Sequence, residues 1–477
     1  QCNHHDLGAL GAASYDRAIE RMMLQLKSFG YNCIRCSHNP YSESFARIAD
    51  RVGMLVVNEL TDKWSDNDYW GGRQPFTHLW HKLITEWIKR DRNRPSIILW
   101  SLGNELQIRE GWAGFEGTND WGITTYNIFN QLVKRWDHTR LTTVAMFPAR
   151  AGAITRHDKE FNDYLVPPEL ACATEVASFN YQSDKYDAYL KYQPDLILFQ
   201  SEAETSKLLQ PYYNMDRKRT VGMAYWGSAE YWGESNKWPK KGWNYSFFDH
   251  TMRPYPQAYL IKSAFMPEIP EVHIGVVDAA GAESVSWNDV TVGRMALNEC
   301  WNHIPGSRQS LFTYTNAHSV ELLVNGQSMG VQQNDTTQAN LRNMIYWKDV
   351  PYGNGGSVVA IARDKSGKEV ARHRIETAGK AVALQIETET PADWKADGMD
   401  LQYINVTAID KKGRPVWDYN EPLTLQMEGA ARLVALDNGG SLYGRALSGH
   451  NFQTNVSGKD ANHSPKHKNS QQCEAEN

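Results

Sequence analysis

The sequence predicts an α/β fold, a (β/α)8 barrel followed by two all-β immunoglobulin-like sandwich domains. Up to about residue 263, short apolar runs alternate with stretches of helical periodicity, as in βα units around a parallel sheet. Later runs alternate with a period of two and are separated by hairpin turn residues. The chain has 477 residues, whereas a single hydrophobic core stops growing at roughly 250–300, so several domains are expected.

The barrel prediction depends on strands that can be counted. The segments 15–30 and 43–52 carry apolar residues at helical spacing with a glycine near their ends, as crossover helices do. An eighth strand is expected before Asn3, so that the chain would begin inside strand one of a TIM barrel. The competing open sheet normally has a glycine-rich phosphate turn after its first strand, and the sequence shows none. The seven apolar runs lie at 32–35, 54–59, 97–105, 142–147, 176–181, 196–202 and 222–227.

The domain boundaries follow changes in composition. The barrel is assigned to residues 1–263, and a linker containing Pro and Glu is assigned to 264–285. The two sandwiches are assigned to 286–378 and 379–456, and the second is expected to be incomplete. Residues 457–477 have few large apolar side chains and are predicted to be disordered. Hairpin turns are expected at Asn325-Gly326, Ser366-Gly367, Asp397-Gly398 and Lys412-Gly413.

Charge and composition argue against several classes of partner. The formal net charge is −5, which gives no support for binding nucleic acid. No apolar stretch reaches the roughly 18–20 residues that span a bilayer, so no membrane partner is expected. Six cysteines are too few for a disulfide scaffold. Cys33 and Cys36 form a CxxC pair within an apolar run, which indicates a buried strand rather than a redox or metal site.

Two glutamates stand at the ends of predicted strands. Glu105 closes the run 97–105 directly after Asn104, and Glu202 closes the run 196–202. The carboxyl ends of barrel strands surround one pocket, and a retaining glycosidase needs two carboxyl groups about 5–5.5 Å apart in such a pocket. Glu204 lies on the same strand face as Glu202 and is a rival nucleophile. The alternative for Glu105 is a helix-capping role.

Several longer strings carry a family resemblance. NHHDLGALGAA, NCIRCSHNPYS, RDRNRPSIILWSLGNE, QSEAETS and AYWGSAEYWGE resemble the barrel of glycoside hydrolase family 2 over roughly residues 1–265. That family includes β-galactosidases, β-glucuronidases and β-mannosidases. The resemblance implies Glu105 as acid/base and Glu202 as nucleophile. It further implies substrate-binding or supporting roles for His5, Arg35, His38, Asn104, Tyr181, Trp226 and Glu230, although a tyrosine or tryptophan at a strand end is otherwise a core residue.

Two departures from the family pattern bear on the sugar. Glu230 stands where the family usually has Asp, which puts the transfer of sugar specificity at this position in doubt. The string Pro239-Lys240-Lys241-Gly242 lacks the Asn of the Asn-Lys-Lys-Gly string that holds a carboxylate in β-glucuronidases, although Asn236-Lys237 could supply a substitute. The sequence therefore favours a neutral sugar, and a galactoside over a glucuronide.

The resulting hypothesis is a retaining exo-β-glycosidase that hydrolyses terminal non-reducing β-D-galactosides by double displacement. The alternatives are a β-glucuronidase or other β-glycosidase of the family, and a truncated barrel that binds carbohydrate without catalysis. Some family members hold Mg2+ near the acid/base, but the spacing of the carboxylates shows no oxygen cage, so no cofactor is expected to be required. The expected partner is a glycoside or oligosaccharide; a homo-oligomer is compatible with the sequence, and the periplasm or secretion is favoured over the cytoplasm.

Overall fold

The computed structural model describes most of the chain as two compact units. Its described residues are 7–64, 76–106, 122–147, 167–231, 246–287, 290–389, 392–439 and 452–458, with the backbone alone at 279–295 and 452–458. The first unit is built from residues 31–227 and the short segment 285–292. The second unit combines the described residues before position 31 with segments 228–284 and 293–477.

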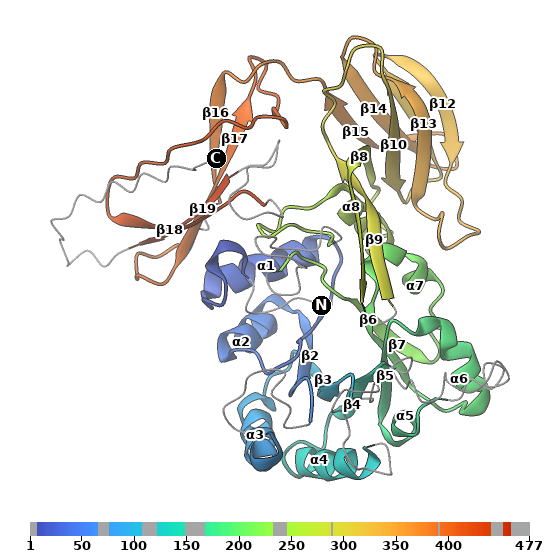
Figure 1. The fold of residues 1–477 in the computed structure, drawn as a ribbon, viewed down its shortest axis with the longest axis vertical. Helices are drawn as coiled ribbons and strands as arrows, with labels where there is room; N and C mark the ends of the chain where they lie inside the picture. Colours follow the sequence, from blue (N-terminus) through green and yellow to red (C-terminus); the bar gives the residue numbers. More distant parts are fainter. Residues whose placement is uncertain are drawn as a thin grey trace. The chain divides into compact units, whose positions relative to one another are not determined.

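A parallel sheet forms the first unit. Its strands pair in sequence order, and the edge strands β1 and β7 contact each other, so the sheet is a nearly closed barrel. The strands lie inside a ring of helices, as Figure 1 shows. All seven strands predicted from the sequence are confirmed, whereas the strand expected before Asn3 lies outside the described residues. The strands are β1 (Cys33–Arg35), β2 (Leu55–Glu59), β3 (Ile97–Asn104), β4 (Leu141–Met146), β5 (Val176–Asn180), β6 (Leu198–Ala203) and β7 (Thr220–Tyr225).

The helices of this unit follow from local sequence signals. In α2, Ser42 accepts a hydrogen bond from the backbone N–H of Phe45 at 3.2 Å, which caps the first turn. Gly53 ends the same helix at φ 70°, a backbone conformation that glycine adopts without strain. The helices are α2 (Glu43–Val52), α3 (Phe76–Asp91), α4 (Ile123–Trp136), α5 (Glu169–Ala173), α6 (Tyr186–Tyr192) and α7 (Gln210–Tyr213).

The register of the sheet aligns the polar ends of its strands. Asn104 of β3 lies opposite Ala145 of β4, and Asn180 of β5 lies opposite Glu202 of β6. Asn104, Asn180 and Glu202 lie at the carboxyl ends of parallel strands, and their side chains are buried. Glu105, which follows Asn104, is partly exposed. The barrel therefore gathers amides and carboxylates at one end, as barrel enzymes do.

The second unit contains α1 (Asp16–Ser28), α8 (Pro256–Phe265) and a β-sandwich. Figure 1 shows the sandwich strands beside α8. The Asn325-Gly326 turn joins two strands with positive φ at both positions, as predicted. The two sheets enclose a core that includes Trp301 and Trp347. One sheet has the order β13 (Met344–Pro351), β10 (Arg308–Thr315), β8 (Val272–Trp287), β9 (Val290–Asn298), and the other β12 (Gln327–Gln333), β11 (Ser319–Val324), β14 (Ser357–Arg363), β15 (Glu369–Glu376).

The predicted linker at 264–285 is wrong in extent. Helix α8 continues to Phe265, and β8 already begins at Val272. Val272, Ile274 and Val276 alternate into the sandwich core, so this segment is a strand of the first sandwich. The Pro and Glu residues that suggested a linker occupy only the short connection before β8.

The last described part of the chain is a single antiparallel sheet. Nε of Arg17 in α1 lies 3.0 Å from Oδ1 of Asp400, the residue before β17. Nε of Arg21 lies 2.6 Å from Oε2 of Glu389 in β16. The second predicted sandwich is represented among the described residues by this sheet, and the tail predicted to be disordered lies almost wholly outside them. None of the described helices combines the length and apolar character needed to cross a membrane. The sheet has the order β16 (Ala383–Glu389), β17 (Leu401–Ile409), β19 (Phe452–Gly458), β18 (Ala431–Asp437).

The indole of Trp100 offers a test of the barrel core. It is fully buried and packs edge-to-face on the ring of Trp87, with ring centroids 4.9 Å apart. Its Nε1–H donates to a carboxylate oxygen of Asp137 at 2.9 Å. Replacing Trp100 by Phe removes the donor and part of the ring, so the free energy of unfolding should fall by about 2 kcal/mol in urea titrations. As a control, Val221→Thr at an exposed position of β7 should change it by less than about 0.5 kcal/mol. Equal effects of the two variants would contradict the role given to Trp100.

Candidate active site

Arg35 is the centre of a buried polar network at the carboxyl ends of the strands. Its side chain is 1% exposed. One guanidinium nitrogen, Nη1, donates to Glu202 Oε1 at 2.8 Å, while Nη2 donates to Glu59 Oε2 at 2.6 Å. Nη2 also donates to Asn104 Oδ1 at 3.0 Å. A single cation on β1 therefore holds groups from β2, β3 and β6.

Glu59 is a network residue that the sequence analysis missed. It ends β2, is fully buried, and accepts from Ser101 Oγ at 2.6 Å as well as from Arg35. Its other oxygen lies 2.6 Å from Nδ1 of His38. The signal was present in the sequence, because Glu59 closes an apolar run in the same way as Glu105 and Glu202 close theirs.

His38 lies between the network and an aromatic ring. It stacks on Trp226 with ring centroids 5.3 Å apart and an interplanar angle of 9°. Its Nε2 is 3.9 Å from Glu202 Oε1 and 3.4 Å from the amide nitrogen of Asn104. Burial lowers the pKa of His38, but the hydrogen bond and charge of Glu59 outweigh burial, so the pKa is raised overall. Protonated His38 therefore adds positive charge beside Glu202.

Three neighbouring groups favour the ionised form of Glu202. Burial raises the pKa of its carboxyl group, whereas the charges of Arg35 and His38 and a hydrogen bond from the Tyr181 side chain oppose this increase. The backbone N–H of Tyr181 also donates to the carbonyl of Glu202 at 2.7 Å. The net pKa remains above the ordinary value because the negative charge of Glu105 acts in the same direction as burial.

The structure distinguishes Glu202 from its rival Glu204. Strand β6 ends at Ala203, so Glu204 lies outside the strand periodicity. Its carboxylate is 3.1 Å from Nζ of Lys207 and accepts from Ser206 Oγ at 3.4 Å. Of Glu202 and Glu204, only Glu202 contacts Arg35 among the described residues.

Glu105 is tied to the same network through Asn180. The amide nitrogen of Asn180 donates to Glu105 Oε1 at 3.1 Å and to Asn104 Oδ1 at 3.0 Å. Ser201 Oγ fixes the orientation of this amide by donating to Asn180 Oδ1 at 2.7 Å. Glu105 itself has φ 47°, and its backbone N–H donates to the carbonyl of Ala145. The side chain of Glu105 thus joins the group that contains Asn104.

An ion pair supports Asn104 from the other side. Asp62 Oδ1 accepts from the Asn104 amide at 3.0 Å and from Lys63 Nζ at 2.6 Å. Lys63 Nζ also donates to the Asn104 carbonyl at 3.0 Å. Burial raises the pKa of Asp62, but Lys63 and His38 outweigh burial and lower it overall. Asp62 and Lys63 follow β2 in a loop that has no periodic pattern, which explains why the sequence did not indicate them.

The structure brings most of the predicted residues together. Glu230 is a buried residue of the second unit, where its backbone N–H donates to the carbonyl of Phe248 at 2.8 Å. His5 and the Lys240 string lie outside the described residues. The residues that share one network or contact it, all in the first unit, are Arg35, His38, Asn104, Glu105, Tyr181, Glu202 and Trp226.

The described residues contain one group with metal-ligating side chains, and it lies in the second unit. His273 Nε2 is 3.0 Å from Glu299 Oε1, and His373 Nε2 is 3.8 Å from the same oxygen. Nδ1 of His373 accepts from the backbone N–H of Ile274 at 3.1 Å, so the proton of the neutral ring is on Nε2. That nitrogen then has no lone pair for a metal, and the group fits a cluster of histidines around a carboxylate better than a metal site.

Paired carboxylates at the carboxyl ends of barrel strands, one of them held by a buried arginine, are an arrangement typical of glycoside hydrolases. The profile of the glycosyl hydrolases family 2 TIM barrel domain matches residues 2–221, and that of glycoside hydrolase family 2 C-terminal domain 5 matches residues 384–455. A domain of unknown function matches residues 306–371. The chain belongs to glycoside hydrolase family 2.

Individual relatives agree with this assignment. The β-galactosidase BoGH2A of Bacteroides ovatus is 27% identical over 92% of this chain and 55% of its own length. A crystal structure of a family 2 member from Bacteroides cellulosilyticus has a TM-score of 0.78 and 28% identity, covering 96% of this chain and 58% of that one. The structure of a family 2 β-glucuronidase has a TM-score of 0.69 and covers 96% of this chain and 45% of that one; at 17% identity it shows the shared fold alone. The chain thus spans about half the length of these relatives.

The contact between Glu59 and His38 gives a prediction for titration. Glu59→Gln removes the negative charge that favours the imidazolium, so the pKa of His38 should fall, because burial then dominates. The change can be followed by NMR of chains labelled at histidine Cε1, with His38→Gln to assign the signal. Glu204→Gln is the control and should leave this pKa unchanged. An unchanged His38 pKa in Glu59→Gln would show that the contact does not set its protonation.

Proposed function

We propose that this chain contains the catalytic machinery of a retaining exo-β-glycosidase, with terminal β-D-galactosides as the preferred substrates. The observation that carries the proposal is the position of Glu202. Its carboxylate is bound by Arg35 and Tyr181 in a network that reaches Glu105 through Asn104 and Asn180. The ionised form of Glu202 is thereby favoured, while Glu105 is partly exposed.

In the first step, Glu202 attacks the anomeric carbon while Glu105 donates a proton to the leaving oxygen. Arg35 and the hydroxyl of Tyr181 keep Glu202 ionised until the bond to carbon forms. As the carboxylate becomes an ester and loses its negative charge, these interactions weaken, which also favours the later release of Glu202. Trp226, stacked on His38, supplies an apolar surface for the sugar ring.

In the second step, Glu105 removes a proton from water, which attacks the anomeric carbon and releases Glu202. Two inversions return the sugar with its β configuration. Asn104 is oriented by Arg35, Asn180 and Asp62, and one of its N–H groups makes only a 3.4 Å contact with His38. That N–H is suited to hold a sugar hydroxyl as positive charge develops on the ring.

The galactoside preference has two supports. The relative BoGH2A is a β-galactosidase, and the string Pro239-Lys240-Lys241-Gly242 departs from the carboxylate-binding string of β-glucuronidases. The family-level alternative is a β-glucuronidase, which would need another carboxylate clamp. The alternative from a different class, a barrel that binds carbohydrate without catalysis, would leave unexplained why a buried arginine and a tyrosine favour the ionised form of Glu202.

Replacing Glu202 by Gln should abolish turnover. The amide keeps the size of the side chain but is not a nucleophile, so kcat on an activated aryl β-galactoside should fall by at least about 10³-fold. Glu204→Gln is the matched control, two residues away and bound to Lys207, and should retain activity. If Glu202→Gln kept its activity and Glu204→Gln lost it, the nucleophile would be Glu204. If neither the unsubstituted chain nor Glu204→Gln were active, the alternative of a barrel that only binds carbohydrate would be favoured.

The anomeric form of the first product tests double displacement directly. Proton NMR during early turnover should show β-galactose before mutarotation produces the α anomer. Initial release of the α anomer would exclude a glycosyl-enzyme intermediate.

Tyr181→Phe should change the pH dependence of the reaction. Tyr181 favours ionised Glu202, so its loss raises the pKa of Glu202 further, and the active anion is lost at higher pH as the solution is acidified. The acidic limb of kcat/KM should move to higher pH, and the plateau should fall by about 10- to 100-fold. Tyr126→Phe removes a buried hydroxyl that contacts Thr142 at 2.7 Å, outside the network, and should leave the acidic limb in place. A limb unmoved by Tyr181→Phe would refute this role.

A further inference from the structure

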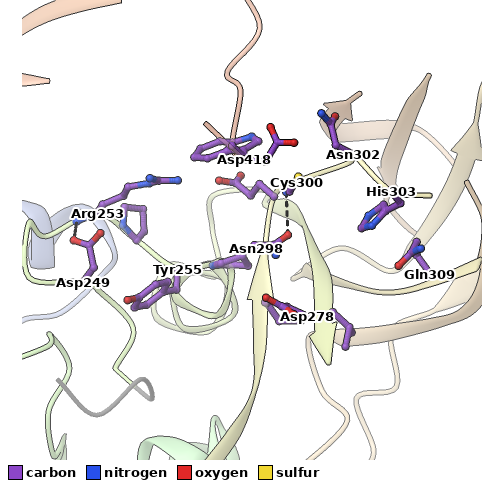
Figure 2. Close-up of a pocket in the computed structure, with 16 residues that line it drawn as sticks. Asp249, Arg253, Tyr255, Asp278, Asn298, Cys300, Asn302, His303, Gln309 and Asp418 are labelled. Atoms are coloured by element: carbon purple, nitrogen blue, oxygen red, sulfur yellow. Dashed lines mark hydrogen bonds between the residues drawn. The ribbon is translucent and has the colours of Figure 1, made fainter. Parts of the chain in front are cut away.

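A polar cavity lies in the second unit, and its described lining residues are not those of the carboxylate network. Its volume is about 470 Å3, within the range of small-molecule sites. Figure 2 shows Asp278 and Asn298, from β8 and β9, between Arg253 on one side and His303 and Gln309 on the other. Trp417 and Asp418, from the loop after β17, complete the lining.

Several lining groups have hydrogen-bonding capacity that described residues do not use. The Asn298 amide oxygen accepts from the backbone N–H of Cys300 at 3.0 Å, which leaves its NH2 group available (Figure 2). Gln309 donates to Ser307 Oγ at 2.9 Å, which leaves its carbonyl oxygen available. The carboxylate of Asp418 has no hydrogen bond or ion pair among the described residues and is exposed. The cavity therefore offers both donors and acceptors.

His303 contributes a further acceptor. Its Nε2 is buried and makes no hydrogen bond within the described part of the chain. Burial lowers the pKa of His303 and outweighs the hydrogen bond to the Cys300 backbone, so the ring is neutral near pH 7. Because the other ring nitrogen bonds to the Cys300 backbone, Nε2 carries a lone pair. This buried lone pair requires a hydrogen bond from water or from a ligand hydroxyl.

Trp417 adds an apolar wall to this polar lining. The Arg253 guanidinium lies 4.3 Å from the centroid of its ring, which holds the indole in a fixed orientation. The neighbouring Asn302 is also fixed, because its amide exchanges two hydrogen bonds with the backbone of Ala378, at 2.8 and 3.2 Å. These contacts set the orientation of two lining side chains, those of Trp417 and Asn302.

We propose that this cavity binds a neutral sugar residue, as a second carbohydrate site distinct from the proposed catalytic one. A pyranose presents hydroxyl groups that each donate and accept, next to C–H surfaces that pack on an indole. The NH2 group of Asn298 matches an accepting hydroxyl oxygen, whereas Gln309, His303 and Asp418 match donating hydroxyls. The proposal concerns a different site and does not depend on the activity assigned to Glu202.

The charges of the cavity select against an acidic sugar. Asp249, Asp278, Glu299 and Asp418 line it, whereas Arg253 is the only cation among its described lining residues and already lies over Trp417. A uronate carboxylate would enter a site with excess negative charge. A neutral sugar avoids this repulsion and can use the same carboxylates as hydroxyl acceptors.

The test uses the full chain carrying Glu202→Gln, which prevents turnover, and 5-fluorotryptophan in place of its 17 tryptophans. Trp417→Phe and Trp226→Phe assign the two 19F resonances that report on the cavity and on the barrel pocket. Titration with lactose, up to concentrations on the order of 50 mM, should shift the Trp417 resonance with saturation. Galacturonate and sorbitol, as acidic and non-cyclic probes, should leave it in place.

Two variants link the shift to named groups. His303→Phe keeps a ring in contact with Trp301 and Tyr352 but removes the Nε2 acceptor, and Asp418→Ala removes the carboxylate. Each should raise the dissociation constant of lactose at Trp417 by about 3- to 10-fold. The control His318→Phe, at an exposed sandwich position, should not. The proposal is overturned if Trp417 does not respond to lactose, responds equally to sorbitol or galacturonate, or responds unchanged in both variants; a shift at Trp226 alone would also overturn it while leaving the proposed function intact.

Discussion

The guanidinium of Arg35 is the group on which the geometry of the candidate active site depends. A buried cation is tolerated only when hydrogen-bonded anions replace the lost water, and removing one partner of such a pair typically costs about 3–5 kcal/mol. Arg35 meets this requirement with Glu59 and Glu202 at 2.6 and 2.8 Å. The same contacts that stabilise the cation hold Glu59 of β2 and Glu202 of β6 in place. One set of interactions therefore both supports the fold and positions the two carboxylates.

Glu59 and Glu202 use the same cation but differ in what surrounds them. Glu59 is fully buried and is bonded by Arg35, His38 and Ser101, which gives it a structural role in the network. Glu202 receives fewer donors, and burial together with the charge of Glu105 raises its pKa. A carboxylate that is held in place but incompletely satisfied is suited to react, because forming a bond to carbon relieves its unfavourable environment.

The seven described strands and most of the site could be read from the sequence because both leave local signals. Apolar runs of four to nine residues marked the strands, and the residues that ended them marked the pocket. Asp62, Lys63 and Asn180 were missed because their importance lies in contacts across strands, which no spacing along the chain encodes. The start of β8 was missed because Pro and Glu residues next to it obscured the alternation of Val272, Ile274 and Val276.

The two hydrogen bonds that the Asn180 amide donates have an evolutionary consequence. Because one NH2 group serves both Asn104 and Glu105, and Ser201 orients it from β6, a replacement at any of these positions leaves the others poorly matched. A single substitution at one of these positions is therefore expected to impair the protein, so these residues should change together or remain the same. The variable part of such a barrel is then the loops above the network, where new sugar preferences can arise without disturbing the reaction beneath.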